Sequence, residues 1–135
     1  MADDVVLNKA ATIERCLRRV REEYAGNAAH LEDQTRQDAI VLNIQRACQA
    51  AIDLAMYHVR LHGLGLPQES RDAFRLLVEA GRLDADLGAE MERMVGFRNV
   101  AVHDYLALSL PIVQAIIERH LGAFEALATW AIREE

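Results

Sequence analysis

The sequence predicts an all-α protein: an up-and-down bundle of four to five helices in a single domain covering residues 1–135. Apolar residues recur every three or four positions along most of the chain, which is the period of a helix with one buried face. No segment alternates β-branched with polar residues, so no strand is expected. The length of 135 residues and the hydrophobic fraction of 52% suit one core.

The first helix is expected to begin after Asp3 or Asp4 and to end near Tyr24, ahead of Gly26. Its predicted buried stripe consists of Leu7, Ala10, Ile13, Leu17, Val20 and Tyr24. A second helix is expected from about Asp33 to His62 and has the widest apolar face of the chain. That face consists of Ile40, Ile44, Ala47, Cys48, Ala51, Ile52, Ala55, Met56 and Val59. We therefore expect this helix to lie at the centre of the bundle.

Glycine and proline in the segment 63–67 end this pattern. Ser70 can then cap a short third helix that ends before Gly81. Its apolar stripe consists of Phe74, Leu77 and Val78. Asp84 can cap a fourth helix, which is expected to bend at, or to continue through, the segment GFRNVAVHDY, residues 96–105. The apolar stripe of this helix begins with Leu87, Met91, Met94 and Val95.

The last helix is expected to begin after Ser109, because serine caps helices and Pro111 fits a first helical turn. Its stripe consists of Ile112, Ile116, Leu121, Phe124, Leu127 and Trp130. The connections between the predicted helices are short, which is typical of a bundle.

The charge balance excludes a broad nucleic-acid-binding surface. The net charge is −6, and Lys9 is the only lysine, so the remaining cations are arginines. Phosphate backbones are bound by clustered Lys and Arg, and the acidic balance argues against a broad basic surface of that kind. Any nucleic-acid site must therefore be local, and no DNA binding is expected. Arg15, Arg18, Arg19 and Arg21 form a basic cluster interleaved with glutamates, which is typical of a solvated helix face. The alternative is a contribution of this cluster to the docking of RNA or of a protein partner.

The sequence favours a cytoplasmic protein. No apolar run approaches the roughly 20 residues that span a bilayer. The stretch MADDVVLNKAATIER has early acids in place of the basic flank and apolar core of a secretion signal. Cys16 and Cys48 are far apart in the sequence, so we expect two buried free thiols instead of a disulfide or a metal pair.

One segment gathers groups that could carry chemistry: Arg98, Asn99, His103, Asp104 and Tyr105. On a regular helix, Asn99 and His103 share a face, and so do Arg98 and Tyr105. Arg98 and His103, however, point about 140° apart. They could meet if the helix distorts, if the arginine curls round, or if a second copy completes the site. We favour a twofold dimer.

If these groups converge, they suit transfer at a phosphodiester without a metal. A neutral His103 could take the proton of a ribose 2′-hydroxyl, while Arg98 stabilises charge on the phosphorus. A second histidine from a partner copy could protonate the leaving oxygen. The alternative is a structural network in which Arg98 pairs with an acid, Asn99 caps a helix end, and His103 bonds within the core.

The stretch MVGFRNVAVHDY, residues 94–105, resembles the signature of the HepT family in the HEPN superfamily. That motif is an arginine, four to six residues, a histidine, and a tyrosine two places on. Here it matches Arg98, His103 and Tyr105, with Asn99 at the usual polar position. The segments ATIERCLRRV, QRACQAAIDLA and LGLPQESRDAFRLLVEAG, and the helix after Ser109, are also similar to the family.

The resemblance implies a HEPN-like helical homodimer that cleaves RNA without a metal or cofactor, as a toxin. It implies that Arg98 and His103 are catalytic at a cleft between protomers, with Asn99 and Asp104 in support. It also implies a partner, a minimal nucleotidyltransferase antitoxin that silences the toxin by transferring AMP to Tyr105. The added phosphate and adenosine would fill the RNA cleft and place negative charge against Arg98.

Other candidate sites are weaker. His58 and His62 are four residues apart, but no glutamate follows His58 and no third ligand is evident, so no metal site is expected. Paired Glu-x-x-His motifs of di-iron bundles are missing as well. His30 and His120 are isolated and are expected at the surface or the edge of the core.

A different class of function also fits the fold: a noncatalytic module that binds a nucleotide or presents a helix face to the nucleotidyltransferase. A fold by itself does not separate the two classes. The intact pair Arg98 and His103 favours the enzyme, and the acidic net charge of −6 favours the module.

Overall fold

The computed structural model describes residues 3–134, and this part of the chain contains helices and no strands. The elements in order are α1 (Asp4–Tyr24), η1 (Ala28–Glu32), α2 (Gln34–Leu61), α3 (Ser70–Glu79), α4 (Ala85–His103), η2 (Tyr105–Ala107), α5 (Leu110–Ala115), η3 (Ile116–His120) and α6 (Leu121–Arg133). The predicted all-α class is confirmed. None of the described helices is long and apolar enough to cross a membrane.

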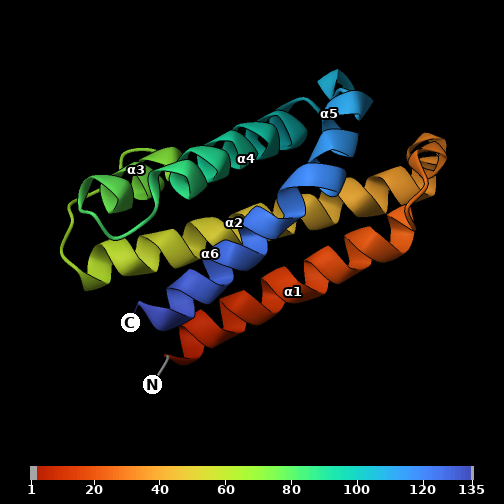
Figure 1. Cartoon of the computed structure of the whole chain (residues 1–135). Helices are drawn as coiled ribbons and strands as arrows, with labels where there is room; N and C mark the ends of the chain where they lie inside the picture. Colours follow the sequence, from red (N-terminus) through yellow and green to blue (C-terminus); the bar gives the residue numbers. More distant parts are fainter. Residues whose placement is uncertain (1–2, 135) are drawn as a thin grey trace.

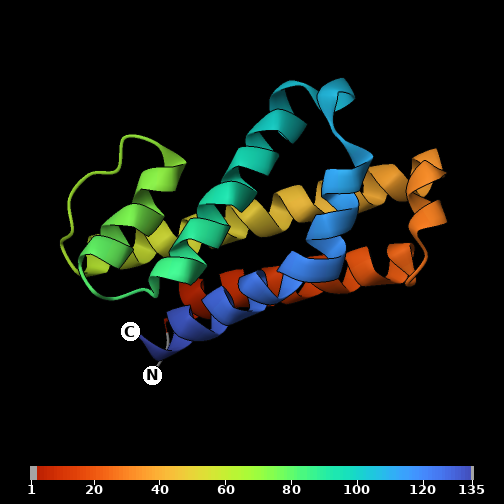
Figure 2. The same cartoon turned by 45° about the horizontal axis from the view of Figure 1, so that its top comes forward.

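The long helices alternate in direction, as Figures 1 and 2 show. α1 and α4 run one way, and α2 and the rod formed by α5, η3 and α6 run the other way. α2 contacts α1, α3, α4 and α6, so it is the central helix that its wide apolar face predicts. The short helix α3 packs between α2 and α4. These contacts confirm an up-and-down bundle.

The helix starts follow mostly from capping side chains. The carboxylate of Asp84 accepts a hydrogen bond from the backbone N of Leu87 at 3.1 Å, as expected of the cap of α4. At α3 the prediction was wrong by one residue, because the cap is Glu69 and not Ser70. Asp72 Oδ2 accepts a hydrogen bond from the backbone N–H of Glu69 at 3.1 Å. This bond places the N-cap of α3 at Glu69, one residue before Ser70.

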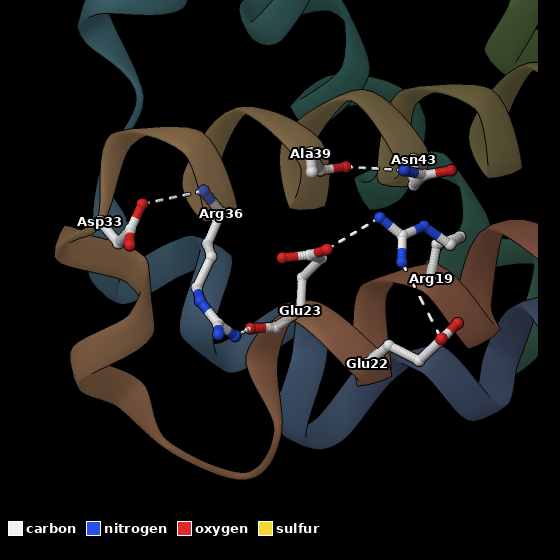
Figure 3. Close-up of polar contacts among 7 residues, drawn as sticks. All are labelled: Arg19, Glu22, Glu23, Asp33, Arg36, Ala39 and Asn43. Atoms are coloured by element: carbon white, nitrogen blue, oxygen red, sulfur yellow. Dashed lines mark hydrogen bonds and ion pairs between the residues drawn. The ribbon is translucent and has the colours of Figure 1, made fainter.

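The first turns of α2 are fixed against the end of α1 (Figure 3). Asp33 Oδ1 accepts from the backbone N of Thr35 at 3.0 Å and of Arg36 at 3.2 Å. The Arg36 guanidinium in turn donates to the carbonyl oxygen of Glu23 at 2.9 Å. Because the cap and the cross-link act on the same turn, the residues that follow on α2 have a defined position.

Two residues of the predicted stripes are exposed. Leu7 is 45% exposed and lines a groove between α1 and α6, while its neighbour Val6 is fully buried. Ile112 is 55% exposed, and Val113 takes the core position of α5. Neighbouring residues on a helix point about 100° apart, so in each pair only one can face the core. The predicted core methionines Met91 and Met94 are buried.

A π-helical turn, η3, lies where one uninterrupted helix was expected. Backbone hydrogen bonds in a π-helical turn span five residues in place of four, and the rod bends at this turn between α5 and α6. Glu118, on this turn, accepts a hydrogen bond from the hydroxyl of the buried Tyr24 and another from Gln114 Nε2 at 3.3 Å. The turn therefore carries a polar contact between α1 and the C-terminal rod.

Candidate active site

α4 remains a regular α-helix through His103 and stops there. The backbone N of Asp104 donates to the carbonyl oxygen of Val100 at 2.8 Å, which closes the last turn. Tyr105 begins the separate 3₁₀ turn η2. The helix therefore continues through the motif, but the expectation that Arg98 and Tyr105 share one helical face was wrong, because Tyr105 lies beyond the helix end.

Arg98 is held by amides instead of an acid. Its Nη2 donates to Gln49 Oε1 at 2.8 Å, and its Nη1 donates to Asn99 Oδ1 at 3.2 Å. Gln49 Nε2 donates to Asp53 Oδ1 at 2.9 Å, and Asp53 Oδ2 lies 2.9 Å from Lys9 Nζ. A polar chain thus runs from α4 across α2 to α1. It orients the guanidinium, and no carboxylate among residues 3–134 pairs directly with it.

His103 is exposed at the C-terminal end of α4 and makes no polar contact within residues 3–134. Asp104 is exposed beside it. Asn99 lies inside the helix and caps no end. Together with the amide partners of Arg98, these placements contradict the alternative of a structural network in each of its parts.

One copy of the chain does not bring the two main candidates into contact. Arg98 and His103 are five positions apart on a regular helix, which separates their directions by about 140°. Within the described residues no hydrogen bond joins them. Three apolar side chains around His103 are exposed: Val100 by 43%, Val102 by 50% and Leu106 by 96%. These exposed apolar side chains leave the end of α4 available for contact with a partner.

Tyr105 is attached to the second turn of α2. Its hydroxyl donates to Asp38 Oδ1 at 2.6 Å and lies 3.3 Å from Gln37 Oε1. Burial, the hydrogen bond to Asp38 and the negative charge of that carboxylate raise the pKa of Tyr105 to about 12. Asp38 and Gln37 were not among the residues predicted from the sequence. The signal that could have marked them is a polar face on α2 formed by Gln34, Gln37 and Asp38, spaced three and four apart.

We expect Asp38→Asn to lower the pKa of Tyr105 from about 12 part of the way toward its ordinary value of 10.0. The substitution removes a negative charge and weakens the acceptor, while burial persists. A raised pKa means that this contact stabilises the fold below pH 10 and that the benefit is lost as pH rises toward 12. Ultraviolet titration of phenolate measures the shift, and Tyr105→Phe assigns the step. If Asp38→Asn left the step assigned to Tyr105 at its wild-type pH, the account would be contradicted.

The remaining histidines have structural surroundings. The buried His58 has its Nε2 2.9 Å from the carbonyl oxygen of Ala131 and its Nδ1 3.5 Å from His62 Nε2. His30 Nδ1 lies 2.7 Å from the carbonyl oxygen of Tyr24, and His120 Nδ1 lies 2.7 Å from Glu90 Oε2. Among residues 3–134, no three His, Cys, Asp or Glu side chains are placed so that they could share a metal ion.

Cys16 and Cys48 are both buried and free, as predicted. Cys48 Sγ donates to the carbonyl oxygen of Met94 at 3.5 Å, which joins α2 to α4 one turn before Arg98. Burial raises the pKa of the Cys48 thiol to about 12.

Comparison with known proteins gives consistent results. The family model "Ribonuclease HepT-like" matches residues 13–129. The mRNA nuclease HepT of Shewanella oneidensis is 43% identical over 123 residues, which cover 91% of this chain and 92% of that protein.

Solved structures of similar chains share the fold. One is the tri-AMPylated Shewanella oneidensis HEPN toxin in complex with the MNT antitoxin, at 42% identity and a TM-score of 0.90 over 95% of this chain and 96% of that one. Another is a toxin–antitoxin structure with AMP-PNP, at 41% identity and a TM-score of 0.91 over 95% of this chain and 97% of that one. The family model covers most of the sequence, and the motif residues stand in it: this chain belongs to the ribonuclease HepT-like family.

Proposed function

We propose that this chain is the toxin of a toxin–antitoxin pair, a ribonuclease that cuts RNA without a metal in the cytoplasm. Arg98 and His103 are its catalytic residues, with Asn99 and Asp104 in support. The observation that carries the proposal is the set of hydrogen-bond partners that hold Arg98, a residue of the family's motif. A guanidinium that is held by Gln49 and Asn99 and has no carboxylate partner within residues 3–134 can bind a phosphate.

The chemistry follows from the two side chains. A neutral His103 takes the proton of the ribose 2′-hydroxyl, whose oxygen attacks the adjacent phosphorus. Arg98 stabilises the charge that develops on the phosphoryl oxygens. As the bond to the 5′-oxygen breaks, His103 of the second copy gives that oxygen a proton. The products are a 2′,3′-cyclic phosphate and a 5′-hydroxyl.

A homodimer supplies what one copy lacks. Arg98 and His103 point about 140° apart on a straight helix, so a twofold partner is the simplest way to place both beside one phosphate. The exposed Val100, Val102 and Leu106 would be covered in such an interface. The cleft therefore lies at the ends of the two α4 helices.

The second partner is a minimal nucleotidyltransferase antitoxin that transfers AMP to Tyr105. Support comes from the relative whose structure is described as a tri-AMPylated HEPN toxin with its MNT antitoxin. Tyr105 lies two residues after His103, so an adenylate on its oxygen would occupy the cleft. It would also place negative charge near Arg98.

The test is cleavage of RNA by the purified chain in excess EDTA. We expect the same rate with and without the chelator, and cyclic phosphate ends on the products. Expression of the chain alone should arrest growth, and coexpression with the nucleotidyltransferase should relieve the arrest. A folded protein that binds RNA or the nucleotidyltransferase without cutting RNA would instead favour the noncatalytic module.

A further inference from the structure

We propose that Asp38 is the base that accepts the phenolic proton of Tyr105 when the nucleotide is transferred. This inference rests on the proposed control by AMP transfer and adds a residue of α2 to the acceptor site. The acceptor site then consists of the Tyr105 hydroxyl and the Asp38 carboxylate, which are 67 positions apart in the chain.

The geometry of the pair is that of a proton donor set on its acceptor. Tyr105 Oη lies 2.6 Å from Asp38 Oδ1, at the short end of the range for a hydroxyl on a carboxylate. Gln34 Nε2 donates to the same carboxylate oxygen at 2.7 Å and reaches Gln37 Oε1 at 3.2 Å. Asp38 is therefore fixed by its own helix, whose first turn is anchored by Asp33 and Arg36.

The direction of the hydrogen bond suits attack on phosphorus. Because the hydroxyl gives its proton to Asp38, a lone pair on the phenolic oxygen stays free for a nucleotide. Phenolate is scarce at neutral pH, since the pKa of Tyr105 is raised to about 12, so the proton must leave during the reaction. The neighbouring His103 and Asp104 make no polar contact with this hydroxyl. Within residues 3–134, Asp38 is thus the titratable group in hydrogen-bond contact with this hydroxyl.

The transfer step balances as follows. Tyr105 Oη forms a bond to the α-phosphorus of a nucleoside triphosphate, the bond from that phosphorus to the bridging oxygen breaks, and pyrophosphate leaves. The phenolic proton moves to Asp38 Oδ1. Protonation also removes the carboxylate charge at the moment when a phosphodiester anion forms beside it, which avoids a repulsion between two anions.

The experiment measures the initial rate of AMP transfer to the full chain by its nucleotidyltransferase, with ATP and Mg²⁺, between neutral and alkaline pH. Asp38→Asn keeps the shape and an acceptor oxygen but cannot take the proton. We expect it to slow the transfer at neutral pH by about a hundredfold or more, the usual contribution of a general base. Its rate should rise with pH as phenolate forms, while the wild-type rate changes little. Glu79→Gln, an exposed carboxylate on α3, is the matched control.

Two results would overturn the assignment of Asp38: transfer to Asp38→Asn at the wild-type rate, or a slower rate whose pH profile matches that of wild type. The second result would mean that Asp38 only positions the ring. Wild-type protein that receives no AMP on Tyr105 would be a different failure, because it would remove the proposed control mechanism and the role of Asp38 with it.

Discussion

Replacement of His103 by alanine is expected to slow RNA cleavage by about a hundredfold or more, because the proposed proton transfer has no substitute. The fold should remain intact. His103 is exposed at the end of α4 and makes no polar contact within residues 3–134, so its loss removes neither packing nor a hydrogen bond. Initial rates on a defined RNA, together with the thermal midpoint from circular dichroism, separate the two effects. Full activity in a folded variant would refute the mechanism.

The same variant tests the shared cleft. When wild type and His103→Ala are mixed in equal amounts and allowed to exchange subunits, only about a quarter of twofold dimers carry two intact copies. If both histidines act on one phosphate, activity falls to about that quarter of the wild-type value. A fall to about one half would mean that each copy works alone.

Replacement of Tyr105 by phenylalanine is expected to abolish silencing while appreciable nuclease activity remains. The ring is kept, and the oxygen that accepts AMP is lost. The phenol is not needed for RNA cleavage in the proposed mechanism, and its pKa of about 12 makes it a poor acid or base near neutrality. Mass spectrometry of protein coexpressed with an active nucleotidyltransferase should show AMP units on the wild-type peptide containing Tyr105 and none on the variant.

Tyr57→Phe is the matched control for this prediction, because Tyr57 is a half-buried tyrosine on α2 that packs against the core. It should be modified and silenced like wild type. Added mass on another residue, or full neutralisation of Tyr105→Phe by the antitoxin, would show that control acts elsewhere.

Most of the fold could be predicted because the local signals agree with the packing. Asp33 and Asp84 cap the helices that follow them, and the wide apolar face of α2 does lie at the centre. The π-helical turn could not be predicted. The predicted stripe does step five positions from Ile116 to Leu121, but Val113, Ile117, Leu121 and Phe124 keep regular helical spacing through the same turn, so the hydrophobic pattern is ambiguous there.

The sequence predicted the motif residues of the site but not the residues that hold them. The motif places Arg98, His103 and Tyr105 within eight positions, so its residues could be named. Their partners could not: Gln49 is 49 positions from Arg98, and Asp38 is 67 positions from Tyr105. Such pairs depend on how α2 packs against α4 and η2. Neither the hydrophobic period of a helix nor the spacing of motif residues contains that information. The end of α4 at His103 was equally hidden, since no glycine or proline stands there.

The buried thiol of Cys48 makes this molecule a reporter of its own local unfolding. Its high pKa and its seat between α2 and α4 keep alkylating reagents from reacting in the closed state. Alkylation of Cys48 therefore occurs when the two helices separate, and its rate gives the free energy of that local opening. Cys16, on α1, supplies an internal reference in the same sample. Binding of RNA, of a second copy or of an adenylate at the end of α4 should stabilise the contact between α2 and α4. Each would then slow the labelling of Cys48 relative to Cys16, and no engineered cysteine is needed.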